Sequence, residues 1–80
     1  MVFLIEYDQH KGTLVDLRRF DDAERRNAEV LRLDLELDLN RRGVEHEVVL
    51  LEAESESALR RTHRRYFETL RELLKPAGGV

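Results

Sequence analysis

The sequence predicts an α+β domain in two layers, with the order β-β-α-β-α and a small three-stranded sheet packed with two helices. Two strand-like segments flank a turn near the N-terminus, a long run of helix formers follows, and a third strand-like segment precedes a final run of helix formers. Hydrophobic side chains make up 41% of the 80 residues and charged ones 39%, which is typical of a folded domain. We therefore expect residues 1–75 to form one compact domain and residues 76–80 to form a flexible tail.

The first two elements are predicted to form a β-hairpin. Residues 2–7 are β-branched and aromatic, residues 8–12 (DQHKG) have the composition of a turn, and residues 13–19 return to an extended pattern. If the first strand is the central one, both of its neighbours run antiparallel to it.

Residues 22–42 are predicted to form a helix, with carboxylates at its start and two arginines followed by Gly43 at its end. Within it, RLDLELDLN at residues 32–40 alternates leucine with polar residues, which is also the pattern of a half-buried strand. Helix is favoured because leucine, glutamate and arginine are helix formers and β-branched residues are missing from this stretch. At 100° per residue the apolar side chains divide into two opposite stripes. One stripe contains Ala28, Leu31, Leu35 and Leu39, and the other contains Ala23, Val30, Leu33 and Leu37.

The last two elements are a strand over residues 44–53 and a helix. Ser55 or Ser57 is expected to cap this helix, and Pro76 is expected to end it, so that residues 59–75 are helical throughout. On such a helix the apolar side chains and His63 fall on one side, and most arginines fall on the other.

The apolar residues exceed what one small core can enclose. If both helices cover the same face of the sheet, Val2 and Leu4 remain exposed on the other face, and one stripe of the first helix lacks a partner. The alternatives are that the helices flank the sheet or that hairpin residues cover the patch. Since the chain has no cysteine for a disulfide, we expect a homodimer, with Val2, Leu4, Leu33 and Leu37 as candidate interface residues.

Positive charge is concentrated at the C-terminal end. From Ser57 onward six basic and two acidic residues give +4, whereas the preceding residues carry −7. The candidate anion-binding or partner-binding residues are Arg60, Arg61, Arg64 and Arg65. A solvated or partner-paired arginine face is favoured over nucleic-acid binding, because the whole chain has a net charge of −3 and Arg64 and Glu68 have the spacing of a helical ion pair.

Histidines and acids give no convergent chemical signal. His63 is expected to be a core or boundary imidazole, and His46 between Glu45 and Glu47 is only a weak candidate for metal binding. Asp34 and Asp38 are four residues apart and are better explained by pairing with arginines. No nucleophile with a partnering base and no phosphate-binding loop is recognisable, so we expect no catalytic residues, no cofactor and no metal.

The function expected from the sequence is that of a small non-enzymatic interaction or adaptor protein that acts as a homodimer. The alternative is a protein that binds nucleic acid or another anion through the arginine-rich face of its C-terminal helix. No apolar run approaches the length of a membrane span and no signal peptide is recognisable, so a cytoplasmic location without membrane contact is the expectation.

Overall fold

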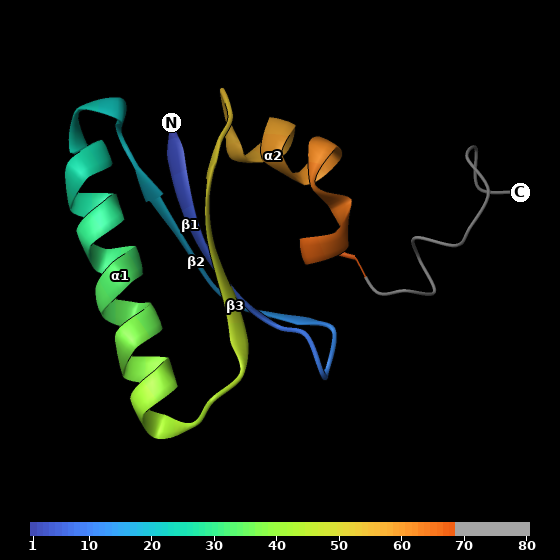
Figure 1. Cartoon of the computed structure of the whole chain (residues 1–80). Coiled ribbons are helices and arrows are strands. Elements are labelled where there is room, and N and C mark those ends of the chain that lie inside the picture. Colours follow the sequence, from blue (N-terminus) through green and yellow to red (C-terminus); the bar gives the residue numbers. More distant parts are fainter. Residues whose placement is uncertain (69–80) are drawn as a thin grey trace, which may run out of the picture.

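The computed structural model describes residues 1–68 and confirms the α+β class and the order of the elements (Figure 1). The elements are β1 (Val2–Asp8), β2 (Thr13–Phe20), the 3-10 helix η1 (Asp22–Glu24), α1 (Arg25–Arg42), β3 (His46–Glu52), α2 (Glu56–Thr62) and the 3-10 helix η2 (Arg64–Tyr66). Within residues 1–68, no helix is long and apolar enough to cross a membrane. The predicted tail, residues 76–80, and the predicted helical residues 69–75 lie outside the described part of the chain.

The three strands form an antiparallel sheet in the order β2-β1-β3, so β1 is central as the sequence analysis assumed. The pairing of β1 with β3 is regular along its length. The pairing of β1 with β2 is interrupted at Val15, which has no partner on β1 because Glu6 faces Asp16 and Tyr7 faces Leu14. This extra residue is a β-bulge, which bends the strand that carries it.

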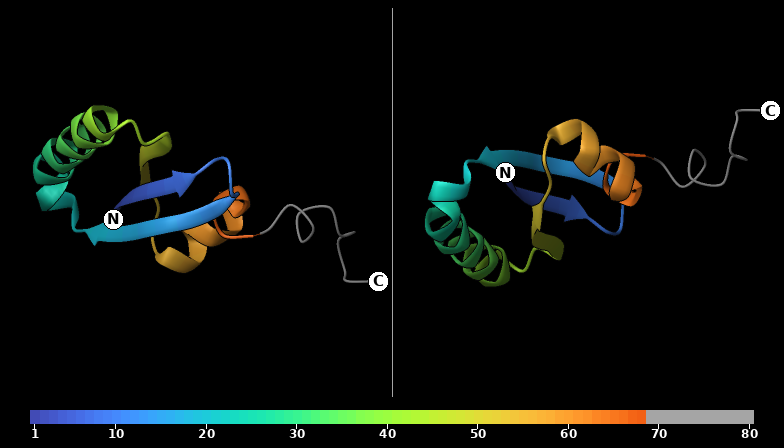
Figure 2. Two further views of the ribbon diagram at one scale, coloured as in Figure 1. Left: turned by 90° about the horizontal axis from the view of Figure 1, so that it is seen from below. Right: turned by 90° about the horizontal axis from the view of Figure 1, so that it is seen from above.

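The two helices lie on opposite faces of the sheet, as the views from above and below show (Figure 2). Successive side chains of a strand point to opposite faces. Phe3 and Ile5 pack with α2 and η2, and α1 contacts β1 and β3. The sheet is thus the middle of three layers rather than one of two. The helices thus flank the sheet, which is one of the two alternatives compatible with the sequence, and this explains why residues 2–5 of β1 are buried on both faces.

The core on the α2 side is built around four buried side chains: Phe3, Ile5, Leu59 and Tyr66. Leu59 is the buried residue of α2 and is fully covered, so this short helix is held to the sheet by a single large side chain. The rings of Tyr66 and Tyr7 meet edge to face with their centres 5.2 Å apart, a favourable geometry for aromatic pairs.

α1 confirms that the alternating leucines at residues 32–40 form a helix and not a strand. The carboxylate of Glu24 accepts a hydrogen bond from the Asp21 N–H at the start of the preceding turn. The helix ends at Gly43, whose φ of 69° lies in the left-handed region that glycine adopts without steric cost. The N–H of Val44 donates to the Leu39 carbonyl, which satisfies an otherwise free acceptor of the last turn.

The prediction of one continuous helix from residue 59 to residue 75 is wrong. Ser55 caps α2 as expected, since its hydroxyl accepts from the Ala58 N–H at 3.0 Å. The helix then ends at Thr62, because His63 has φ −125° and ψ 52°, which is not a helical conformation. The chain turns there and continues as η2. The arginines on either side of His63 therefore do not share one helix face.

Candidate functional site

The largest exposed apolar side chains on α1 form a face that points away from the sheet. Val30, Leu33 and Leu37 are 53%, 53% and 54% exposed, and we call these three residues the outer face of α1. On the opposite side of the helix, Ala28 and Leu39 are buried. The predicted division into two stripes is therefore confirmed only in part: Ala28 and Leu39 face the sheet and Leu35 is half-buried, but Leu31 of the same predicted stripe is 37% exposed.

The candidate interface residues Val2 and Leu4 are placed differently from the expectation. Their exposed fractions are only 1% and 3%, because α1 covers the face of the sheet to which they belong. The expectation of an uncovered sheet face at these two residues is thus wrong. Of the four candidates, Leu33 and Leu37 are the ones available at the surface.

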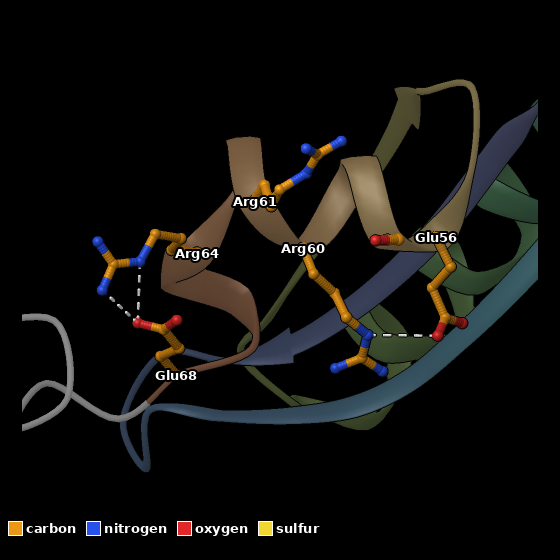
Figure 3. A pocket seen from close by; sticks show the side chains of 6 residues that line it. Glu56, Arg60, Arg61, Arg64 and Glu68 are labelled. Atoms are coloured by element: carbon orange, nitrogen blue, oxygen red, sulfur yellow. Dashed lines mark hydrogen bonds and ion pairs between the residues drawn. The ribbon is translucent and has the colours of Figure 1, made fainter. Parts of the chain in front are cut away.

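Two of the four candidate arginines are paired with neighbouring acids (Figure 3). Nε of Arg60 donates to Glu56 at 3.2 Å, and the guanidinium lies 4.5 Å from the centre of the Phe67 ring. Arg64 donates to Glu68 through two nitrogens, at 3.0 and 2.7 Å. The hydrogen bond to Glu68 raises the pKa of Arg64, and the reciprocal bond lowers the pKa of Glu68.

A third arginine belongs to a cluster that joins η2 to β3. The Tyr66 hydroxyl donates to Glu47 at 2.5 Å and accepts from Arg65 at 2.5 Å, and Arg65 also donates to Glu47 at 2.6 Å. Gln9 donates to the other oxygen of the same carboxylate at 2.8 Å. We call Glu47, Arg65 and Tyr66 the Glu47 cluster.

The Glu47 cluster perturbs the titration of all three of its members. Burial acts to raise the pKa of Glu47, but the hydrogen bonds from Tyr66, Gln9 and Arg65 together outweigh it and lower the pKa. Burial, followed by the bond to Glu47, raises the pKa of Tyr66 to about 12. The bond to Glu47 also raises the pKa of Arg65. The carboxylate, the guanidinium and the neutral hydroxyl therefore stabilise one another at neutral pH.

The Glu47 cluster could not be predicted from the sequence, although one signal is present. By strand alternation Glu47 shares a face with Val49 and Leu51, and a carboxylate on an apolar face requires a charged or hydrogen-bonding partner. The partner could not be identified because the sequence predicted a straight helix, on which Tyr66 is only a core residue.

The four arginines thus do not present one positive surface. Arg60, Arg61 and Arg64 line an open hollow of about 480 Å³, which is also lined by the acids Glu56 and Glu68. Arg61 extends away from these two acids in Figure 3. Arg65 lies instead over the Tyr66 ring, 4.2 Å from its centre.

The two acids and the one histidine of residues 45–47 each have a different partner. Glu45 lies 2.8 Å from His10, and His46 lies 2.6 Å from Glu6, whereas Glu47 faces Tyr66. In the part of the chain that the structure describes, no three His, Asp or Glu side chains are grouped as metal ligands.

His63 and Asp38 have local partners. His63 is half-buried at the break after α2, and its Nδ1 lies 2.9 Å from the Thr62 hydroxyl, so it is a boundary residue. Asp38 lies 3.0 Å from Arg42, in agreement with the expected pairing.

Comparison with protein-family models, with curated proteins and with solved structures found no match. The function must therefore be argued from the surfaces of the molecule itself.

Replacing Arg60, Arg61, Arg64 and Arg65 together with glutamine is expected to cost modest stability and to change no nucleic-acid affinity. Three of these arginines are paired within the chain, and the net charge of −3 opposes the approach of a polyanion. Thermal melts and titration of duplex DNA and structured RNA at physiological salt would measure both effects. Micromolar binding by the native chain that the four changes abolish, with the fold retained, would contradict this expectation.

Proposed function

We propose that the protein is a small non-enzymatic interaction protein that acts as a homodimer through the outer face of α1. The observation that carries this proposal is that Val30, Leu33 and Leu37 lie one helical turn apart in succession and are each more than half exposed. Large apolar side chains grouped on one surface favour burial against another protein.

The size and composition of the chain support a second copy as the partner. A chain of 80 residues without cysteine gains little from its own core and cannot add a disulfide, so association is a common source of further stability. A contact between identical faces also satisfies two-fold symmetry, which is the commonest arrangement among oligomers.

The alternative function, binding of nucleic acid or another anion by the arginines, has weaker support. Arg60, Arg64 and Arg65 are each within hydrogen-bonding distance of a carboxylate of the same chain. An incoming phosphate would have to displace these carboxylates while also being repelled by them.

The proposal is tested by Leu33→Glu and Leu37→Glu, made separately. Each change places a carboxylate in the centre of the proposed contact, so sedimentation at micromolar concentration should shift from about twice the monomer mass toward the monomer mass. Val15→Glu is the matched control, because Val15 is also about half exposed (48%) but lies on β2. Retention of the dimer in both leucine variants would show that the outer face of α1 does not make the contact.

A further inference from the structure

β3 is an edge strand whose apolar residues are incompletely covered. Among the strands of residues 1–68, in the order β2-β1-β3, its one neighbour is β1. The four apolar residues of central β1, residues 2–5, are all buried, whereas residues 48–51 of β3 (VVLL) are all only half-buried. Edge strands with apolar side chains are sites at which another strand can add.

The direction of the backbone groups of β3 follows from one hydrogen bond. The Ala53 N–H donates to the Met1 carbonyl at 3.2 Å, which places the backbone groups of Ala53 on the β1 side. In an antiparallel pair these groups alternate in direction from residue to residue. The N–H and C=O groups that point away from β1 therefore belong to His46, Val48, Leu50 and Glu52.

The other edge of the sheet is less suited to pairing. β2 has a bulge at Val15, and the charged side chains of Asp16, Arg18 and Arg19 follow it. Bulges and charges are the features that keep natural edge strands from pairing. β3 has neither between Val48 and Leu51.

We propose that β3 pairs antiparallel with β3 of a second copy about a two-fold axis at Val49, which forms a continuous six-stranded sheet. In this register Val48 lies opposite Leu50 of the other copy, His46 lies opposite Glu52, and Val49 faces its own counterpart. All four outward-pointing residues then exchange hydrogen bonds, about eight in all. On one face of the sheet this register places Val48 beside Leu50 and His46 beside the carboxylate of Glu52, which are favourable pairs. On the other face Val49 meets its counterpart, and Glu47, which already has partners in the Glu47 cluster, lies opposite Leu51.

The outer face of α1 is not part of this contact, because it points away from the sheet and its Val30 lines a hollow together with Phe20 of β2. The side of α1 toward β3 carries Arg25, which pairs with Glu52. The inference rests on the proposed function for the homodimer itself, and it offers the β3 edge as a second candidate for the surface that makes the contact.

A cysteine at Val49 tests the register directly. The chain has no other cysteine, and Val49 with its counterpart would form a pair without hydrogen bonds, with Cα atoms about 4.5 Å apart, within reach of a disulfide. Under mild oxidation Val49→Cys should give a covalent dimer in high yield on a non-reducing gel. Val15→Cys is the control, since this more exposed position on β2 should cross-link only slowly.

Amide hydrogen exchange of the unmodified chain supplies a second measurement that requires no variant. The N–H groups of Val48 and Leu50 should become slower to exchange as the protein concentration is raised, because they are bonded only in the dimer. If the chain sediments as a dimer but Val49→Cys does not cross-link and both amides exchange freely, the β3 register is wrong and the proposed dimer stands. If the chain stays monomeric, both proposals fail.

Discussion

Leu59→Ala is expected to lower the free energy of unfolding by about 3 kcal/mol, the typical cost of a cavity left by a buried leucine. Leu59 is 0% exposed, packs in the core cluster with Phe3 and Ile5, and is the buried residue that fixes the seven-residue α2. So short a helix has little stability of its own and depends on this packing.

Urea denaturation followed by circular dichroism measures this loss as a lower midpoint with an unchanged slope. Val15→Ala provides the control, because Val15 is about half exposed and lies outside the core cluster. A loss for Leu59→Ala below about 1 kcal/mol would mean that α2 is not anchored to the sheet as described.

Glu47→Ala is expected to lower the free energy of unfolding by about 2 kcal/mol. It removes the carboxylate that accepts hydrogen bonds from the buried Tyr66 hydroxyl and from the Arg65 guanidinium. Tyr66→Phe should cost less, since Glu47 then still accepts from Arg65 and Gln9. The double variant measures the coupling between the two residues. The double variant should lose about 1 kcal/mol less free energy of unfolding than the sum of the losses in the two single variants. Losses that simply add would show that Glu47 and Tyr66 do not stabilise the fold as a unit.

The Glu47 cluster also predicts how stability changes with pH. The pKa of Glu47 is lower in the folded chain than its ordinary value of 4.5, so its stabilisation is complete above that value and is lost as the pH falls through the folded pKa. The pKa of Tyr66 is raised from 10.0 to about 12, so its contribution is complete below pH 10.0 and is lost between there and about 12. Melts of the native chain and Tyr66→Phe should therefore differ less at pH 12 than at pH 9; a difference that is unchanged across this range would contradict the assignment.

The regular elements could be predicted from the sequence because local signals agree with the fold. The turn DQHKG separates two extended segments, Gly43 supplies the left-handed residue that ends α1, and Ser55 caps α2. The leucines of α1 were assigned correctly because helix propensity and the terminal signals outweighed their alternation.

The break at His63 could not be predicted, because residues 59–75 consist largely of helix formers on either side of it. In the structure the turn directs Tyr66 onto Tyr7 and Glu47, so contacts distant in sequence override local propensity. The placement of the two helices on opposite faces of the sheet also could not be predicted. Apolar residues on both faces of β1 are compatible with cover by helices and with cover by another subunit. The strand order also could not be predicted, so the sequence indicated the outer leucines of α1 as an interface but did not show that β3 lies at an edge of the sheet.

Sedimentation equilibrium of the unmodified chain over a range of micromolar concentrations measures whether the chain forms a homodimer. Because the outer face of α1 and the edge of β3 both lack partners within residues 1–68, we expect one species of about twice the monomer mass, which dissociates only on dilution. A mass that remains that of the monomer at the highest concentration would contradict it.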